Sequence, residues 1–174
     1  MKIHSIVKTF CDVKVQVLLA MIVITSCKKP EEYPIVPIIS FKDMYTERNP
    51  QGLDDALYVT LNFTDGDGDI GYNDVGFNDP VYDDPNSQYY NNFQEKTFHY
   101  ENGVVVQDTV DLSARMQNIT PDVKNKTLKG DILRELPLPP NLVNDTFYFE
   151  IFIYDRALHA SNIITTPGII LTTH

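Results

Sequence analysis

The sequence contains no tryptophan, only two cysteines, and only 14 lysine and arginine residues against 24 aspartate and glutamate residues. The resulting net charge of −10 argues against a nucleic-acid partner, because binding to a phosphate backbone requires a positive patch. Both cysteines, Cys11 and Cys27, lie near the N-terminus, so no disulfide framework is expected in the rest of the chain. A hydrophobic core must therefore hold the fold, and 174 residues suffice to build one as a single domain.

The chain also lacks the common signatures of catalysis. Neither a Gly-x-Ser-x-Gly nor a His-Glu-x-x-His pattern occurs. After residue 26 the histidines are only His99, His159 and His174, and no cysteine follows Cys27. We therefore predict that the protein is not an enzyme. A surface glycan-active hydrolase is the alternative, because acidic residues for a pair of catalytic carboxylates are abundant.

The longest apolar run lies in residues 1–26, where lysines precede an apolar stretch at 15–24 that is too short to span a bilayer as a stable helix. The run ends in Ile24-Thr25-Ser26-Cys27, which resembles the bacterial lipobox. The resemblance implies a signal peptide at 1–26, cleavage before Cys27, acylation of that cysteine, for example with palmitate, and attachment to a membrane through the lipid. An uncleaved anchor or an ordinary secretory signal is the alternative.

Residues 27–34 form a polar tether with two prolines. Glu31 and Glu32, shortly after the cysteine, are similar to the signal that exports Bacteroidota lipoproteins to the outer face of the outer membrane. A solvated linker explains these glutamates equally well. The resemblance implies a lipid-anchored protein of the bacterial cell envelope, in the outer membrane, and leaves the periplasmic or surface face open.

The remaining residues, 35–174, have the pattern of an all-β domain. Runs rich in Val, Ile, Thr and aromatic residues occur at 35–41, 57–64, 94–101, 104–108, 127–133, 146–154 and 163–171. Asn102-Gly103 predicts a type I′ hairpin turn, and the polar stretch 42–56, with a turn signal at 49–52, is expected to connect the first two strands. No stretch has convincing helical periodicity. We predict an immunoglobulin-like β-sandwich of about seven strands.

An acidic loop spaced by glycines follows the strand predicted at 57–64. Gly66 and Gly68 alternate with aspartates and let the backbone curl, so that several carboxylates can converge on one cation. The second and penultimate strands of such a sandwich run in the same direction, so the loop after 146–154 is expected at the same end. We predict a Ca²⁺ site made of Asp65, Asp67, Asp69, Asp74 and Asp155.

The predicted calcium site does not follow the EF-hand template, because Ile70 stands where that loop needs glycine and Gly76 where it needs glutamate. An alternative source of positive charge is Arg156, which can pair with a carboxylate through both arms of its guanidinium group while the rest of the loop is solvated. The sequence does not decide between the metal and the arginine.

The Asp-Gly-Asp-Gly-Asp segment at 65–69 and the Asp-Arg-Ala segment at 155–157 resemble a family of Bacteroidota lipoproteins with immunoglobulin-like or fibronectin III-like domains. We predict that the chain is a binding or structural module, and an accessory subunit of an outer-membrane complex is a further alternative. The Tyr- and Asn-rich stretch 72–93 offers aromatic rings and amides to a glycan or protein partner, and a solvated loop is the alternative.

Overall fold

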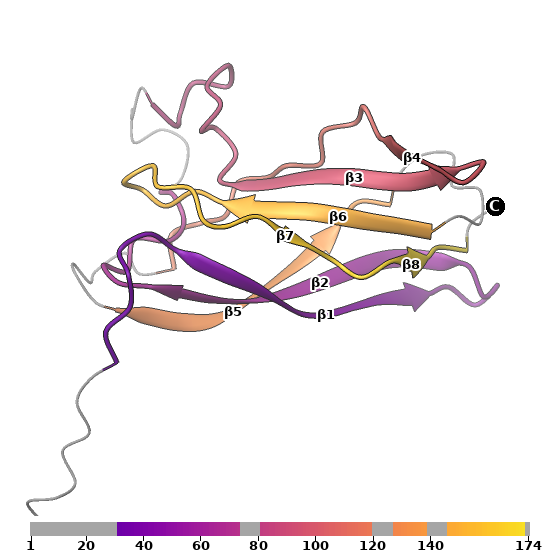
Figure 1. Ribbon diagram of the computed structural model, residues 1–174, viewed down its shortest axis with the longest axis horizontal. Helices are drawn as coiled ribbons and strands as arrows, with labels where there is room; N and C mark the ends of the chain where they lie inside the picture. The colour runs from indigo at the N-terminus through magenta and orange to yellow at the C-terminus, as the bar shows by residue number, and fades with distance from the viewer. Residues whose placement is uncertain (1–30, 74–80, 120–126, 139–145, 173–174) are drawn as a thin grey trace, which may run out of the picture. The chain divides into compact units, whose positions relative to one another are not determined.

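Two antiparallel sheets face each other across a shared apolar core (Figure 1). The computed structural model describes residues 31–73, 81–119, 127–138 and 146–172, so the predicted signal peptide and Cys27 lie outside the described residues. All of the strands belong to one unit, Glu32–His174. The strands are β1 (Ile38–Arg48), β2 (Asp54–Asp65), β3 (Phe93–Glu101), β4 (Val104–Gln107), β5 (Leu128–Leu136), β6 (Thr146–Ile153), β7 (Ile164–Thr165) and β8 (Ile169–Ile170).

The strand order confirms the predicted immunoglobulin-like sandwich. One sheet has the order β1-β2-β5, and the other has the order β4-β3-β6-β7, with β8 also paired to β6. In the lettering of immunoglobulin folds these sheets correspond to A-B-E and C′-C-F-G. The last predicted strand is divided into β7 and β8 around Pro167, because proline cannot donate to a β-ladder. The described residues include no helix, and hence none that could cross a membrane.

The first strand differs from the prediction at both ends. It begins directly after Pro37 and continues to Arg48, through a stretch that was expected to be a polar connection. β1 pairs with β2 over its whole length, from Ile38 opposite Thr64 to Arg48 opposite Asp54, and this pairing outweighs the polar composition. As an edge strand, β1 can leave its polar side chains in water.

Two predicted turns are confirmed. Asn102 and Gly103 have φ angles of 52° and 81°, and positive φ at both central residues defines the type I′ turn between β3 and β4. The turn at 49–52 is closed by the backbone N–H of Gly52, which donates to the carbonyl oxygen of Asn49 at 2.9 Å.

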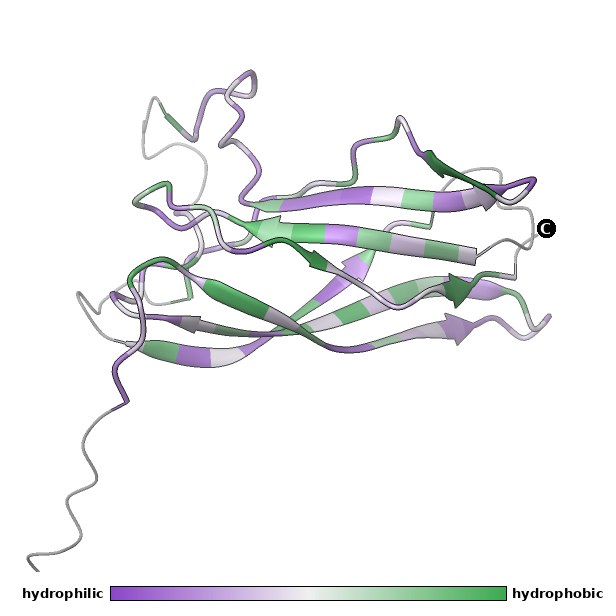
Figure 2. Cartoon of the chain, in the orientation of Figure 1, coloured by the Kyte–Doolittle hydropathy of each residue, from purple (hydrophilic) through white to green (hydrophobic). Residues whose placement is uncertain are grey.

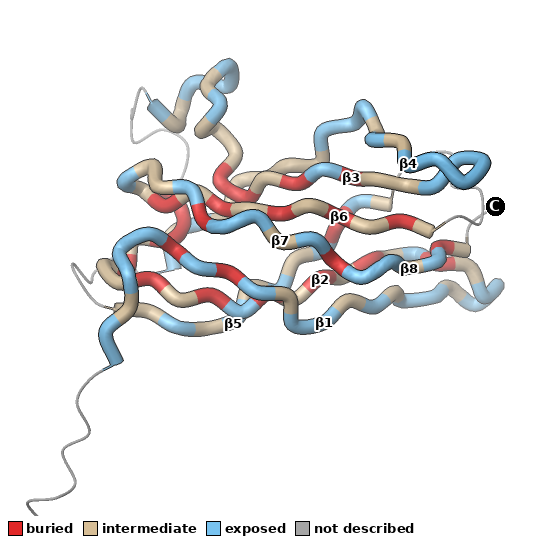
Figure 3. The backbone as a smooth tube through the Cα atoms, in the orientation of Figure 1, coloured by how far each residue is buried: buried red, intermediate tan, exposed pale blue. Residues whose placement is uncertain are grey.

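The core consists of alternate residues on facing strands. Figure 2 shows the hydrophobic positions of β2 and β6 alternating with polar ones, and Figure 3 shows buried positions alternating in the same way. Each such side chain stabilises the fold by about 1.5–3 kcal/mol when fully buried. The central members are Leu57, Val59, Leu61 and Phe63 on β2 and Phe147, Phe149, Ile151 and Ile153 on β6.

The chain turns after β2 and after β6 lie together at one end of the sandwich, as predicted from the common direction of these two strands. Ile70 and Asp155 form an isolated antiparallel bridge between the two turns. The backbone N–H of Arg156 also donates to the carbonyl oxygen of Asp69 at 3.1 Å. These bonds hold the acidic loop against the segment after β6 and so bring their carboxylates together.

Candidate metal centre: an acidic cluster between two loops

The backbone of the acidic loop requires glycine at both positions between the aspartates. A Cβ atom on Gly66 would lie 2.3 Å from the carbonyl oxygen of Tyr33, and the N–H of Gly66 donates to the carbonyl oxygen of Pro34 at 2.8 Å. Gly68 has a φ angle of 73°, in the left-handed region that side chains disfavour. The loop therefore packs closely on the tether and reverses direction directly after β2.

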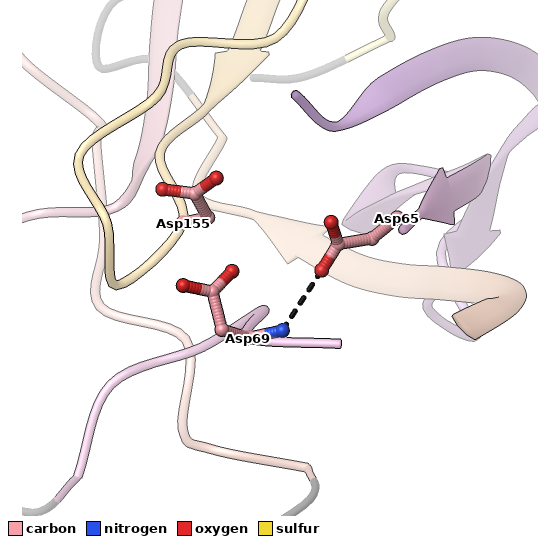
Figure 4. A group of neighbouring side chains, drawn as sticks. All are labelled: Asp65, Asp69 and Asp155. Carbon is pink, nitrogen blue, oxygen red and sulfur yellow. Dashed lines mark hydrogen bonds between the residues drawn. The ribbon is translucent and has the colours of Figure 1, made fainter. Parts of the chain in front are cut away.

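Three carboxylates converge in this region. Asp65, at the end of β2, Asp69 in the loop and Asp155 after β6 each offer an oxygen atom within 4.8 Å of the others (Figure 4). Asp65 and Asp155 are fully buried, and Asp69 is partly buried. These three residues, defined here as the acidic cluster, belong to the predicted calcium site. Asp67 lies in the same loop beside them, and Asp74 is outside the described residues.

Several carboxylate oxygens of this loop have no hydrogen-bond partner. One oxygen of Asp65 accepts from the backbone N–H of Asp69 at 2.9 Å, as Figure 4 shows, and one oxygen of Asp69 accepts from the N–H of Ala157 at 3.0 Å. The Oδ1 atoms of Asp65, Asp67 and Asp69 are buried without a partner. Such atoms carry a desolvation cost that a bound proton or cation removes.

The electrostatics of the cluster lead to the same conclusion. Burial raises the pKa of Asp65 to about 6, helped by the charges of Asp67 and Asp69 and opposed by the hydrogen bond from the Asp69 amide. Burial likewise raises the pKa of Asp69 to about 6, with the charges of Asp155 and Asp67 adding to the effect. Near neutral pH Asp65 and Asp69 are mostly ionised and repel one another, so the cluster favours a cation.

Arg156 uses its guanidinium group on backbone carbonyl groups. Its Nη1 atom donates to the carbonyl oxygen of Gly71 at 2.9 Å and to that of Ile70 at 3.3 Å. Among the described residues no ion pair joins Arg156 to an aspartate. Its charge lowers the pKa of Asp69, but less than burial and the neighbouring carboxylates raise it. Arg156 therefore fixes the loop backbone without pairing directly with the acidic cluster.

Sequence reasoning did not predict a role for His159 at this site. Its Nδ1 atom lies 2.9 Å from one oxygen of Asp155, and its backbone N–H donates to the other oxygen at 2.7 Å. The hydrogen bond and charge of Asp155 raise the pKa of His159. The spacing of four residues between the two was the available signal, but it identifies a contact only once the tight turn is known.

The Tyr- and Asn-rich stretch packs on the domain in its described part. Tyr72 and Phe93 are fully buried, so neither ring is available as a platform for a glycan. Tyr72 stacks on Tyr82 with ring centroids 4.4 Å apart, and the guanidinium group of Arg115 lies 5.2 Å from the Tyr72 ring. Arg115 also pairs with Asp83 at 2.8 Å. The aromatic residues near this arginine thus stabilise the fold.

Comparisons with known proteins do not add a family. No family model matches the sequence, and no curated protein or solved structure matches the chain.

Proposed function

We propose that this chain is a lipid-anchored binding or structural module of the bacterial cell envelope, without catalytic activity, and that Ca²⁺ stabilises the loop end of its sandwich. The observation that carries the calcium proposal is the convergence of Asp65, Asp69 and Asp155, with buried carboxylate oxygens that have no hydrogen-bond partner. The anchor is supported by the leader and by Ile24-Thr25-Ser26-Cys27.

Calcium fits the donor set better than zinc does. All available ligand atoms of the cluster are oxygens, and the histidine beside it, His159, already uses Nδ1 on Asp155. Ca²⁺ takes six to eight oxygen ligands at about 2.3–2.6 Å and accepts irregular loops, whereas zinc prefers nitrogen and sulfur. Asp65, Asp69 and Asp155 would hold the ion, and we propose Asp67 and Asp74 as further ligands. A bound ion would offset the burial and the repulsion that raise the pKa values of Asp65 and Asp69.

The lipid anchor would place an acidic domain on a membrane without help from basic residues. After removal of 1–26, the charge becomes 11 − 23 = −12, because this segment contains three lysines and one aspartate. Each buried CH₂ of an acyl chain contributes about 0.8 kcal/mol to membrane binding. We propose the outer membrane as the location and a glycan or protein as the partner.

The hydrolase alternative requires a pair of carboxylates that a glycan can reach. Asp65 and Asp155 have no solvent-exposed surface, and the loops that carry them are joined by backbone hydrogen bonds. This burial supports a structural role for the acidic cluster, because a sugar ring must contact both carboxylates of a glycosidase.

Calcium binding is tested by thermal unfolding of the full chain in a nonionic detergent, in EDTA and in millimolar Ca²⁺. A site with a Kd 100-fold below the free calcium concentration adds about 2.7 kcal/mol, which raises Tm by several degrees. We expect the double variant Asp65→Asn/Asp69→Asn to lose this shift. In EDTA this variant should be at least as stable as the wild type, because two repelling charges, one fully and one partly buried, are gone.

Asp55→Asn is the matched control, since Asp55 is an exposed aspartate at the opposite end of β2. This variant should keep the full calcium shift. The absence of a shift in the wild type, or an equal shift in the double variant, would refute the proposed metal site.

The anchor is tested by labelling cells with a palmitate analogue and separating membranes from soluble proteins. Cys27→Ser should abolish labelling and leader cleavage, because the sulfur that accepts the lipid is gone. Cys11→Ser, the matched control, should be labelled and cleaved like the wild type. A labelled Cys27→Ser protein, or an unlabelled wild type, would contradict the lipoprotein assignment.

A further inference from the structure

A second acidic region lies at the edge of β3, where the chain that leaves β4 runs back beside this strand. The backbone N–H of Asp108 donates to the carbonyl oxygen of Thr97 at 2.9 Å, and further along Ala114 and Phe93 exchange two backbone hydrogen bonds. Between these two contacts the chain advances six residues, from 108 to 114, whereas β3 advances only four, from 93 to 97. The extra residues of the segment 108–114 bulge outward. Figure 1 shows the chain arching away from β3 directly after β4.

The bulge leaves a cavity of about 240 Å³ against the edge of β3, which we call the bulge pocket. Ser113 joins the bulge to β3 at this pocket. Its Oγ atom accepts from the backbone N–H of Glu95 at 3.1 Å, in place of a hydrogen bond between backbone groups. The lining includes Gln94, Glu95, Gln107, Asp108, Asp111 and Ser113. The bulge of the backbone beside β3 thus forms the pocket, and three acidic residues line it.

Glu95 is the buried charge in this lining. It is only 3% exposed and lies on the core-facing side of β3, opposite Ile151 of β6. Its Oε1 atom accepts from the hydroxyl of Thr97 at 2.8 Å, whereas its Oε2 atom is buried and has no hydrogen-bond partner. Among the described residues no ion pair includes Glu95. A buried carboxylate oxygen without a donor, on a residue that lines a cavity, carries a desolvation cost that a bound proton or cation removes.

The neighbouring charges make a cation beside Glu95 still more favourable. Asp111 and Asp108 both lie close enough to raise the pKa of Glu95, after the larger effect of burial and against the hydrogen bond from Thr97. His99 lies 3.5 Å from Asp108. Lys96 also lines the pocket, but strand alternation places it on the opposite face of β3 from Glu95. Lys96 is the one lysine or arginine among the described residues that line the pocket, and it is thus directed away from Glu95.

The spacing of these acids selects the kind of cation. Within the described part of the chain, the acidic cluster of Asp65, Asp69 and Asp155 is the group whose ligand atoms converge within 4.8 Å, and the pocket carboxylates do not form such a group. They therefore cannot chelate one ion together at the 2.3–2.6 Å that calcium needs. A cavity of about 240 Å³ also exceeds the ~30 Å³ occupied by one water molecule several-fold.

We propose that the bulge pocket binds a primary ammonium or guanidinium group, with Glu95 at its base and Asp111 and Asp108 at its rim. Such a group supplies several N–H donors that point in different directions, and charge-assisted hydrogen bonds to carboxylates are the stronger kind. The source is either a free small amine or a lysine or arginine side chain of a partner protein.

The test is an NMR titration of the ¹⁵N-labelled full chain, in a nonionic detergent at pH 8, with n-butylammonium, n-butylguanidinium and the uncharged n-butanol. We expect the two cations to cause saturable shifts of the amides at 94–97 and 107–113, and butanol to cause none. Glu95→Gln should raise the Kd at least ten-fold, because it keeps the size of the side chain and removes its charge. Glu101→Gln, at the exposed end of the same strand, is the matched control and should bind like the wild type.

Asp111→Asn provides a second variant if Glu95→Gln perturbs the fold. It keeps the Oδ1 atom that accepts from the N–H of Ser113, and it should raise the Kd several-fold. The peptides acetyl-Ala-Lys-Ala-amide and acetyl-Ala-norleucine-Ala-amide identify the source. Tighter binding of the lysine peptide than of butylammonium points to a protein side chain, and equal or weaker binding points to a free amine. Absence of saturable shifts, an equal response to butanol, or an unchanged Kd in both acidic variants would overturn the proposal.

Discussion

The two acidic regions of this domain both contain buried carboxylate oxygens without a hydrogen-bond partner, but their acidic side chains are arranged differently. Each contains a fully or almost fully buried carboxylate, Asp65 in one and Glu95 in the other, with an oxygen atom that has no hydrogen-bond partner. In the acidic cluster the carboxylates converge within 4.8 Å between two loops. In the bulge pocket they are spread around a cavity of about 240 Å³. The spacing of the acids, more than their number, determines whether one metal ion or a larger organic cation satisfies them.

The regions also differ in the support that surrounds each carboxylate. Three backbone N–H groups, those of Asp69, Ala157 and His159, donate to members of the acidic cluster, and the imidazole of His159 pairs with Asp155. Glu95 has the hydroxyl of Thr97 as its hydrogen-bond donor, and the charges nearest to it are those of further acids. In the absence of any ligand, we therefore expect the energetic cost of ionisation to be larger at Glu95.

The largest effect that separates the regions should come from Glu95→Gln in EDTA without added amine. Burial raises the pKa of Glu95 from 4.5 to about 7, so this group contributes stability below pH 4.5 that is lost as the pH rises through about 7. At 1.36 kcal/mol per pKa unit, the loss amounts to about 3 kcal/mol at pH 8.5. Chemical unfolding should therefore find the variant more stable than the wild type at pH 8.5, and similar at pH 4.

Asp108→Asn and Asp111→Asn sharpen this comparison, because each removes a rim charge that raises the pKa of Glu95. Each should make the loss of stability between pH 4.5 and 8.5 smaller than in the wild type, because the pKa of Glu95 moves back towards its ordinary value, but the reduction should be less than in Glu95→Gln. An equally steep decline in wild type and Glu95→Gln between pH 5 and 8 would show that Glu95 is not the group that titrates. Asp65 and Asp69, with pKa values of about 6, would then be the groups to test.

The contrast between the regions also explains how much the sequence could predict. The strand pattern at 57–64 and 146–154 and the Asn102-Gly103 turn are local signals, so the sandwich and one hairpin followed from the sequence. The acidic cluster was predictable in outline, because glycine spacing and the common direction of β2 and β6 bring its members together. Its hydrogen bonds, including that of His159, depend on a turn whose conformation the sequence does not specify.

The bulge pocket had no comparable signal in the sequence. Glu95 appeared as one polar residue in a strand, and its burial arises because the chain after β4 covers the edge of β3. The segment that covers this edge is held by backbone hydrogen bonds at Asp108 and Ala114, with extra residues between them. This arrangement arises from tertiary contacts and has no local sequence pattern. For the same reason the extension of β1 to Arg48 was missed, since it follows from pairing with β2 rather than from composition.

The smallest effect should come from His159→Gln, which tests the support of the acidic cluster. Pairing with Asp155 raises the pKa of His159, so its contribution to stability is complete below the ordinary histidine pKa of about 6.5 and is lost as the pH rises through the higher folded-state value. The imidazole is 36% exposed, so solvent limits the contribution to about 1 kcal/mol or less. Urea unfolding in EDTA should find the variant less stable at pH 5.5 and nearly equal to the wild type at pH 9. Both variants gain stability relative to the wild type as the pH rises, but the two substitutions have effects of opposite sign. Glu95→Gln removes a charged form that leaves Oε2 without a donor, whereas His159→Gln removes a charged form that pairs with Asp155. A destabilisation that is the same at both pH values would show that the side chain of His159 acts by packing, and its charge would then have no part in supporting the cluster.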